Sequence, residues 1–467
     1  MVGARDERRR GGAQRGGPQD GARGARTGAP RDVQAREAAR DPVRAGALGL
    51  LRGVLEQGAS IGDQVAAGAL GALDPAGRAR AQRLALGALR GIAAAEAALA
   101  PHLARKPEPA LRALLILAAA EVLASPGAAH GAVAAAVDLA RALPGGAAKA
   151  GFVNAVLRRV AAAPARPAPP PELPGWIRAR LVARFGAAPV SATEAVLARA
   201  EVPLDLTLRD PATAQVWARA IGAEVLPTGG LRLGRAGQVS ALPGYAEGAW
   251  WVQDAGAAAV VAALGDVAGR DILDLCAAPG GKTMQLAAAG ARVVAVDPSA
   301  RRMARVAENL ARTGLQARLV TADALTADLA QADAVLLDAP CTATGTIRRH
   351  PELPLIRREG DLGALMALQA ALIDRALGLV RPGGVVVYAT CSLLPEEGED
   401  QIAAAHKRAA AGACPAFETE AIAPPAGLAE AATPAGHLRI WPHHWAERDG
   451  IDGFFVARLR RSADAPP

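Results

Sequence analysis

The sequence predicts an α + α/β multidomain protein: an all-α bundle at the N-terminus, a small α+β linker subdomain, and a doubly wound α/β domain at the C-terminus. Its 467 residues are about two to three times the length of an ordinary domain. Ala and Leu recur at helical spacing in the first third, whereas short β-branched runs alternate with helical stretches after residue 253. Hydrophobic residues make up 51% of the chain, which excludes a wholly disordered or collagen-like protein.

The N-terminal third divides into a basic segment and a helical segment. Residues 1–40 contain ten arginines, five acidic residues and few large apolar side chains. We predict a disordered basic tail, because burial of so few apolar side chains cannot offset the conformational entropy lost on folding. From 41 to 163, Ala and Leu recur at three- and four-residue spacing. Prolines interrupt this pattern at Pro75, Pro101, Pro126 and Pro144. We therefore predict several short helices packed in a bundle.

A proline-rich stretch at 164–175 predicts a stiff linker, because its six prolines are incompatible with a helix or a sheet ladder. We expect a small α+β subdomain over 176–252. Two helices should begin it, the second over 191–200. Ser191 opens that helix with Glu194 three residues later, which is a capping-box spacing.

Strand and helix patterns alternate from 253 to 461. The β-branched runs are Asp271–Leu275, Arg292–Val296, Ala317–Thr321, Ala334–Leu337, Val385–Tyr388 and Phe454–Leu459. Helical stretches include Ser299–Thr313 and Asp361–Val380. Such alternation predicts a parallel sheet covered by helices on both faces. A short tail, 462–467, follows.

Neither a membrane span nor a metal site is predicted. A span needs about 18 or more apolar residues in a row, and charges such as Arg112 and Glu121 interrupt the apolar stretches. The N-terminal charge has no apolar stretch behind it, so we expect a cytoplasmic protein without a signal peptide. The four cysteines lie far apart with no C-x-x-C pair, which favours neither a disulfide framework nor a zinc site.

The strongest chemical signal lies where the first strand of the α/β domain ends. Residues 274–283 read DLCAAPGGKT and lead into a helix, and a strand, a glycine-rich turn and a helix start make a nucleotide cradle. A Walker A loop would need glycine where Cys276 stands, and no G-x-G-x-x-G spacing is present. Asp297 ends the next strand, where a carboxylate can accept both ribose hydroxyls. A nucleoside ligand without phosphates suggests S-adenosylmethionine.

Further polar side chains follow the other strands of this sheet. Ligands of open α/β sheets bind outside the carboxyl ends of the strands, so four aspartates and two cysteines should converge on one crevice. They are Asp274, Asp297, Asp323, Asp338, Cys341 and Cys391. We expect Asp323 to meet the adenine edge. A lone cysteine is more often a core residue, but two at strand ends beside a nucleotide site favour catalysis.

A thiol beside S-adenosylmethionine suggests methylation at carbon 5 of a pyrimidine. That carbon is a weak nucleophile, and a thiolate added at carbon 6 turns the ring into an enamine-like nucleophile. The proton at carbon 5 must then leave and the thiol must be expelled, so a second group nearby is useful. Asp338 can hold nitrogen 3 of the ring and share its proton.

Several segments resemble a known family. DLCAAPGGKT, DAPCTATGTIRRHPE and YATCSLLPEEGE are similar to signature segments of the Sun-family RNA (cytosine-5) methyltransferases, as are VSALPGY, VQDAGA and DGFFVARL. The helical part, with GFVNAVLRRV, resembles the NusB-like domain fused in bacterial small-subunit ribosomal RNA methyltransferases of the RsmB type. The resemblance covers about Asp41 to Arg460 and implies a Rossmann-like, S-adenosylmethionine-dependent methyltransferase domain.

The resemblance also implies residue roles. It makes Cys391 of the TC motif the nucleophile and Cys341 of the PC motif the group that assists release, and Asp338 completes the expected catalytic set. The expected cofactor contacts are Cys276, Ala277, Ala278, Pro279, Gly280, Gly281, Lys282, Asp297, Asp323 and Asp338. Small-subunit ribosomal RNA is the implied partner of a protein that we expect to be a monomer.

The positive charge suggests where RNA is held. The formal net charge is +8, and residues 141–200 contain many arginines and two acidic residues. The expected phosphate contacts are Arg158, Arg159, Arg178, Arg180, Arg184, Arg348 and Arg349. Two alternatives stay open: the same chemistry on transfer RNA, and a non-catalytic RNA-binding ribosome assembly factor. The second would be expected to have lost Cys391 or the glycine loop, and both are present.

Overall fold

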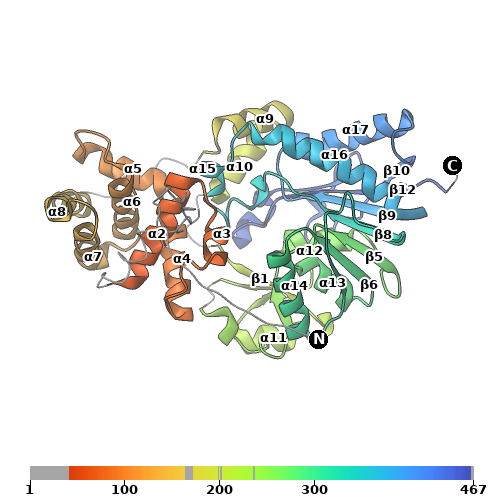
Figure 1. Cartoon of the computed structure of the whole chain (residues 1–467), viewed down its shortest axis with the longest axis horizontal. Helices are drawn as coiled ribbons and strands as arrows, with labels where there is room; N and C mark the ends of the chain where they lie inside the picture. Colours follow the sequence, from red (N-terminus) through yellow and green to blue (C-terminus); the bar gives the residue numbers. More distant parts are fainter. Residues whose placement is uncertain (1–40, 164–171, 198, 200–201, 235–236, 464–467) are drawn as a thin grey trace, which may run out of the picture.

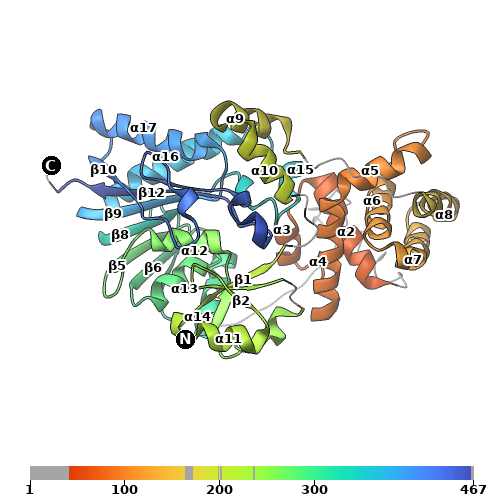
Figure 2. The same ribbon diagram turned by 180° about the vertical axis from the view of Figure 1, so that it is seen from behind.

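A computed structural model describes residues 41–163, 172–197, 199, 202–234 and 237–463 (Figure 1). The predicted tail at 1–40, most of the predicted linker and the end of the predicted tail at 462–467 lie outside the described residues. The described part contains a helical region, a small antiparallel sheet and a larger mixed sheet, seen from the opposite side in Figure 2. The predicted fold class is confirmed.

The helical region contains seven α-helices among the described residues. They are α2 (Pro42–Gln57), α3 (Ile61–Ala66), α4 (Pro75–Arg90), α5 (Ile92–Leu99), α6 (Pro109–Ala124), α7 (Ala129–Arg141) and α8 (Gly146–Ala162). The side chains of Asp41, Ser60 and Asp74 each accept a hydrogen bond from a backbone N–H at the start of α2, α3 or α4, which is why those helices begin there. Helix α6 is the centre of this bundle, and Leu114 and Ile116 are fully buried in it.

Helices α9 (Gly175–Phe185) and α10 (Ala187–Leu197) follow the linker. The predicted start of the second helix at Ser191 is wrong, because α10 begins four residues earlier, directly after Gly186 with its φ of 82°. Glu194 does not close a capping box: its carboxylate is buried and accepts hydrogen bonds from the backbone N–H of Leu173 and from Arg178. The spacing of Ser191 and Glu194 is that of a capping box, but the carboxylate of Glu194 forms tertiary contacts instead.

A small antiparallel sheet forms the next unit. Its strands are β1 (Leu204–Leu208), β2 (Glu224–Val225), β3 (Leu231–Leu233) and β4 (Trp250–Val252), in the order β2-β3-β1-β4, with α11 (Ala214–Ile221) between β1 and β2. Leu206, Leu231 and Trp250 fill its core. Helix α12 (Ala255–Ala262) then leads into the large sheet.

The large sheet has the order β10-β12-β9-β8-β5-β6-β7, with β11 paired to β12. Its strands are β5 (Asp271–Leu275), β6 (Arg292–Asp297), β7 (Arg318–Thr321), β8 (Ala332–Asp338), β9 (Val380–Thr390), β10 (Phe417–Glu420), β11 (Leu438–Ile440) and β12 (Phe454–Arg461). Strands β5 to β9 are parallel, as predicted, but β12 runs antiparallel to both β9 and β10. The prediction of an all-parallel sheet is therefore wrong. The segment after β10 stays at the carboxyl edge, so β12 starts there and runs backwards between its neighbours.

Helices cover both faces of this sheet. They are α12, α13 (Gly281–Ala288), α14 (Ala300–Thr313), α16 (Asp361–Leu379) and α17 (Glu399–Ala410). The short α15 (Leu353–Ile356) contacts α2 of the helical region instead. In β8, Ala334 and Leu336 face the core under α12, whereas Val335 and Leu337 face the core under α16 and α17. This period of two explains why the central strands read as continuous apolar runs.

Helix α16 is long and apolar enough, by length and composition, to cross a membrane. Its residues Leu372, Ile373 and Leu377 are buried in the core against the sheet.

Candidate active site

The predicted cofactor loop connects β5 to α13. It requires glycine at 280, where φ is 99° and an added Cβ would lie 3.0 Å from Cγ1 of Val306. Cys276 also has a positive φ, of 61°. Burial raises the pKa of its thiol to about 12, and nearby carboxylates act in the same direction. Both effects disfavour the thiolate form of Cys276.

Asp297 lies at the end of β6, beside the loop. Its side chain is buried, and it accepts hydrogen bonds from the backbone N–H of Ser299 at 3.0 Å and of Ala278 at 3.4 Å. The guanidinium of Arg302 lies 3.5 Å from the same carboxylate. Asp323 lies two residues beyond the end of β7, is exposed, and accepts a hydrogen bond from the N–H of Leu325 at 3.0 Å.

Asp274 is a fully buried carboxyl directly under the loop. Thr283 donates a hydrogen bond to its Oδ2 at 2.5 Å, while Oδ1 has no hydrogen-bond partner among the described residues. Burial raises the pKa of Asp274 to about 7, although the Thr283 bond and the charge of Lys282 oppose the shift. An unpartnered buried oxygen is costly, so a donor or cation of a bound ligand would fit here.

The two predicted catalytic thiols meet. Sγ of Cys341 lies 3.5 Å from Sγ of Cys391, although fifty residues separate them in the chain. Cys341 is buried and Cys391 is half-buried. The hydrogen bond with Cys391, together with burial, raises the pKa of Cys341 well above its usual value. This shift favours the protonated form of Cys341, and Cys391 is the more exposed thiol of the pair.

A buried carboxylate supports the Cys341 loop. Glu397 accepts hydrogen bonds from the backbone N–H of Thr342 at 2.9 Å and from the side chain of Gln369 at 2.9 Å. The N–H of Gly345 donates to the carbonyl of Cys391 at 2.9 Å, which fixes the two thiol-bearing segments together. The sequence showed Glu397 within a recognised segment, but nothing in its spacing indicated this support.

Lys282 joins the cofactor loop to the end of β8. Its Nζ lies 2.7 Å from Oδ2 of Asp338 and 5.2 Å from the centre of the Phe454 ring. Burial alone would lower its pKa, but the charge and hydrogen bond of Asp338 outweigh burial and raise it. The sequence placed Lys282 in the loop without a partner, because the adjacency of β5 and β8 is not visible in the chain.

Two of the expected RNA contacts form ion pairs within the protein, and of these Arg348 is buried and Arg349 half-buried. Arg348 is 3% exposed; its Nε lies 2.7 Å from Asp452, and its guanidinium also pairs with Asp254. Arg349 pairs with the same two carboxylates. Carboxylates already hold both guanidinium groups, so the geometry does not favour a phosphate contact by Arg348 or Arg349, which stays a prediction. The sequence could not reveal these partners, because they lie about a hundred residues away.

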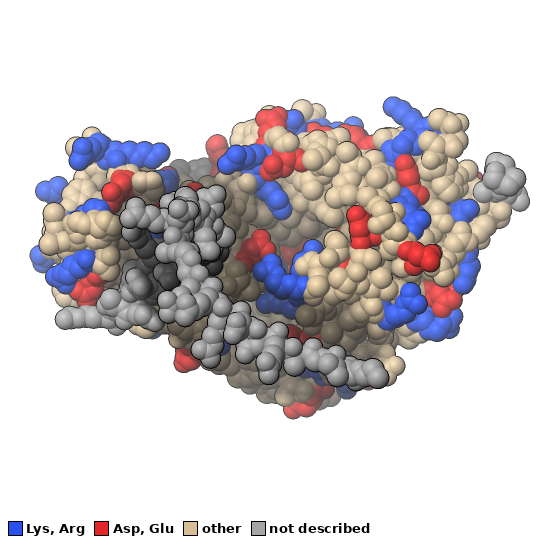
Figure 3. Space-filling model, in the orientation of Figure 1, with Lys and Arg blue, Asp and Glu red and all other residues tan. Residues whose placement is uncertain are grey.

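The other five predicted arginines do not form one surface. Arg158 and Arg159 are exposed on α8, whereas the remaining three lie on α9, which the other helices of the bundle separate from α8 in both views (Figures 1 and 2). Arg178 pairs with Glu194, and Arg180 pairs with Glu359 and Glu396. Figure 3 shows Lys and Arg spread over the visible face rather than gathered in one patch.

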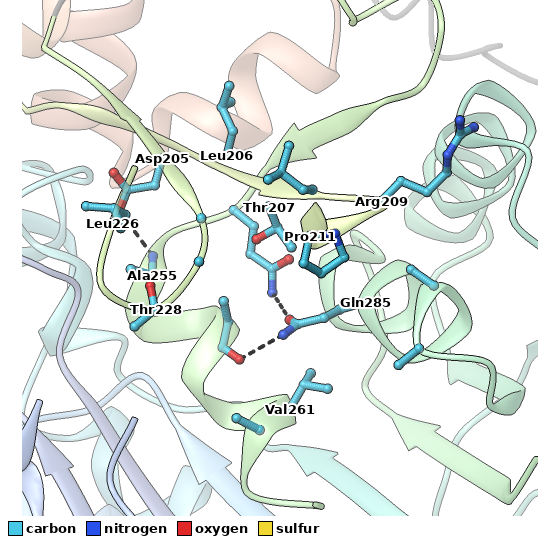
Figure 4. A pocket seen from close by; sticks show the side chains of 18 of the residues that line it. Asp205, Leu206, Thr207, Arg209, Pro211, Leu226, Thr228, Ala255, Val261 and Gln285 are labelled. Atoms are coloured by element: carbon cyan, nitrogen blue, oxygen red, sulfur yellow. Dashed lines mark hydrogen bonds between the residues drawn. The ribbon is translucent and has the colours of Figure 1, made fainter. Parts of the chain in front are cut away.

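A cavity of about 300 Å³ lies between β1 and the helices α12 and α13 (Figure 4). Gln253 donates to Gln285 at 2.9 Å, and Gln285 donates to the carbonyl of Ala258 at 3.0 Å. These amides satisfy each other, and none of the cysteines lines the cavity. It lies behind the helix that follows the cofactor loop and is separate from the thiol pair.

The sheet order with its reversed strand β12, together with the loop and Asp297, defines the class of S-adenosylmethionine-dependent methyltransferases. Comparison with known proteins specifies the family. The family model described as 16S rRNA methyltransferase RsmB/F matches residues 261–460, and the NusB family model matches residues 41–162. The chain belongs to the RsmB/F family, and S-adenosylmethionine is its cofactor.

Relatives in this family align over most of the chain. The ribosomal RNA small subunit methyltransferase B of Xylella fastidiosa is 37% identical over 423 residues, covering 87% of this chain and 97% of its own. The protein of the same name from Xanthomonas campestris is 36% identical over 445 residues, covering 90% and 97%. The alignment with the protein of that name from Salmonella arizonae, at 41% identity, is limited to 49% of this chain and 51% of that one.

Solved structures share the fold. The crystal structure of PH0851 aligns with a TM-score of 0.70 at 22% identity, covering 89% of this chain and 98% of its own. NSun6 from Pyrococcus horikoshii, solved with SFG, aligns with a TM-score of 0.52 at 20% identity, covering 62% and 99%.

Proposed function

We propose that this protein transfers a methyl group from S-adenosylmethionine to carbon 5 of a cytosine in small-subunit ribosomal RNA, through a covalent bond between Cys391 and carbon 6. The relatives that align over most of the chain are named as methyltransferases of that RNA. The proposed location of the protein is the cytoplasm, where it would have access to ribosomal RNA. The observation that carries the proposal is the pair of thiols, 3.5 Å apart, beside the cofactor loop.

The thiol pair fits carbon 5 better than other acceptors. Methylation of an oxygen or an exocyclic nitrogen needs no nucleophile from the protein, because those atoms have lone pairs of their own. Carbon 5 becomes nucleophilic only after a thiolate has added at carbon 6. Cys391 is half-buried and reachable, and it follows the end of β9 at the carboxyl edge of the sheet.

Cys341 fits the second half of the reaction. When Cys391 adds to carbon 6, its own proton is released to water. After methylation, the electron pair of the C5–H bond re-forms the ring double bond while the bond from carbon 6 to sulfur breaks. Cys341 can give its proton to the departing sulfur and take up the proton lost from carbon 5, so both thiols return to their starting state. Its raised pKa suits a group that keeps a proton until that step.

Asp338 and Lys282 complete the proposed site. Asp338 lies at the end of β8 and is 30% exposed, so its carboxyl can contact nitrogen 3 of a cytosine while Lys282 holds it in place. S-adenosylmethionine supplies the methyl group. The loop residues from Cys276 to Lys282, with Asp297 and Asp323, would hold it, and the unpartnered Oδ1 of Asp274 supports a ligand that brings a donor to this position.

Bisulfite mapping of small-subunit ribosomal RNA tests the proposal. RNA from cells with the intact gene should carry one or more protected cytosines that become reactive when the gene is deleted. Complementation with the wild-type chain should restore protection, and complementation with Cys391→Ala should not. Protection that moved instead to transfer RNA would support the alternative substrate.

A further inference from the structure

The helical region touches the segment that carries Cys341. Arg90, the last residue of α4, donates from Nε and Nη2 to the backbone carbonyl of Arg348 at 3.4 and 3.2 Å. Arg348 lies seven residues beyond Cys341. A side chain of one region therefore holds the backbone of the catalytic loop of another.

A second contact lies four residues further along. Oε1 of Glu352 accepts a hydrogen bond from the backbone N–H of Ile61, the first residue of α3, at 3.3 Å, and Glu352 is 1% exposed. Burial lowers the pKa of Arg90 while the charge of Glu352 opposes that shift, so the two groups interact within the same interface. Ile356 of α15 packs against the core of the bundle, and α15 lies beside α2 (Figure 1).

The segment from Cys341 to Glu352 is held at both ends. At the catalytic end, Glu397 binds the N–H of Thr342, and the N–H of Gly453 donates to the carbonyl of Gly345 at 2.8 Å. In the middle, the side chain of Arg348 is fixed by Asp254 and Asp452. The backbone carbonyl of Arg348 accepts hydrogen bonds from Arg90 of α4. Since the 341–352 segment is fixed at these other points, a movement of α4 would displace its backbone.

We propose that Arg90 is a positioning residue for the release step. Through Arg90, the helical region holds the 341–352 segment so that Cys341 stays close to Cys391. This contact sets how fast methylated RNA leaves the enzyme. The inference rests on the proposed role of Cys341 in release. It assigns the helical region a part in the chemistry in addition to any contact with RNA. Arg90 acts through the backbone and touches neither the cofactor nor the reacting thiols.

The test compares Arg90→Ala with Arg83→Ala, a control on the same helix whose side chain is exposed and has no partner in the described part of the chain. Unmodified small-subunit ribosomal RNA transcript is the probe. Steady-state turnover of Arg90→Ala should fall about tenfold, which corresponds to about 1.4 kcal/mol for losing the half-buried, charge-assisted contact to the Arg348 carbonyl. The fraction of enzyme bound covalently to RNA on a denaturing gel should rise. Affinity for S-adenosylmethionine and the single-turnover rate of methyl transfer should not change.

Two further variants separate positioning from simple loss of structure. Arg90→Lys keeps one donor and should recover most of the turnover. The double variant Arg90→Ala/Cys341→Ala should accumulate no more adduct than Cys341→Ala alone, because a residue that acts through Cys341 has no effect once Cys341 is absent. If Arg90→Ala does not fold, Glu352→Gln replaces it and should raise the adduct fraction to a smaller extent.

The outcomes distinguish this inference from the proposed function. Additive effects in the double variant, or equal adduct fractions in Arg90→Ala and Arg83→Ala, would overturn the positioning role while leaving the proposed function intact. If wild-type protein and Cys341→Ala gave no covalent adduct at all, the proposed function itself would fail first.

Discussion

The ammonium group of Lys282 lies 2.7 Å from the carboxylate of Asp338. Lys282 belongs to the loop after β5, Asp338 to the end of β8, and Cys391 follows β9. One side chain thus connects the cofactor loop to the carboxyl proposed to hold the ring. The cofactor loop is therefore joined directly to the end of β8, three residues before Cys341.

Replacing the two cysteines should have opposite effects on the covalent adduct with RNA. Cys391→Ala should form no covalent adduct with RNA containing 5-fluorocytosine and should not methylate, because the ring is no longer activated. Cys341→Ala should still methylate but remain attached to ordinary RNA, since release lacks its proton donor. Denaturing gels and methyl-transfer assays measure both. Cys414→Ala, a half-buried cysteine outside the crevice, is the control and should behave as wild type. Near-normal turnover in Cys391→Ala would show that the nucleophile has been misassigned.

Asp297→Ala should weaken binding of S-adenosylmethionine, because a charge-assisted contact to the ribose is worth about 1.5–3 kcal/mol per hydrogen bond. Asp323→Ala should have a smaller effect, since that side chain is exposed. Isothermal calorimetry with the cofactor measures both affinities. Asp328→Ala, an exposed aspartate in the connection between β7 and β8, should leave the affinity unchanged. An unaltered affinity in Asp297→Ala would remove that residue from the site.

The buried carboxyl of Asp274 should make the free enzyme less stable as pH rises. Its pKa is about 7 in the folded protein and near 3.8 when unfolded, so the folded state binds more protons between these values. Its contribution to stability is complete below about pH 4 and is lost as pH approaches about 7. Urea unfolding at pH 5 and pH 8 should show this loss in wild type and a smaller loss in Asp274→Asn. Asp328→Asn is the control, and an equal loss in both variants would contradict the assignment.

Arg348→Ala should destabilise the fold by about 3–5 kcal/mol, because two buried carboxylates, Asp254 and Asp452, would then share a single cation, Arg349. Asp254 and Asp452 are both less than a tenth exposed, so water cannot replace the guanidinium. The free energy of unfolding in urea measures the cost. Arg305→Ala, on an exposed position of α14, should change it little. A stable Arg348→Ala with a reduced salt dependence of RNA binding would instead restore this residue as a phosphate contact.

Arginines without ion-pair partners should carry the salt dependence of RNA binding. The double variant Arg158→Gln/Arg159→Gln should reduce the slope of log affinity against log salt by about 1 to 2, because each lost phosphate contact removes about 0.7–0.9. The double variant Arg178→Gln/Arg180→Gln should reduce it less, since carboxylates already neutralise those side chains. Filter binding over a salt series measures both. A larger loss for the second pair would place the RNA on α9.

Local patterns predicted most of the fold. The β-branched run at 271–275 matches β5, and the helical pattern at 299–313 matches α14 within one residue, because both depend on side chains that are neighbours in the chain. The direction of β12 was not predictable, since it depends on which edge of the sheet the preceding loop leaves from. The predicted helix start at Ser191 is wrong for a related reason. The carboxylate of Glu194 accepts a hydrogen bond from the backbone N–H of Leu173, and this contact exists only in the packed structure.

The site residues also differ in how far the sequence could predict them. The DLCAAPGGKT loop and the two cysteines could be recognised from short segments, and the structure brings the cysteines together. The hydrogen-bond partners of the side chains of Lys282, Arg348 and Glu397 lie between 28 and 104 positions away in the chain. An arginine that neutralises buried carboxylates and one that meets a phosphate look identical in a sequence, because only burial distinguishes them.

Strand β12 has a consequence for how the enzyme is made on the ribosome. It is the last of the described strands to be synthesised, yet it fills the gap between β9 and β10, and Gly453 just before it supports the Cys341 loop. While residues 454–461 are still inside the exit tunnel, β9 has no neighbour on one side and the loop lacks part of its support. The helical bundle can fold much earlier, as N-terminal domains generally do. A nascent chain could therefore present a folded helical region long before it could methylate anything.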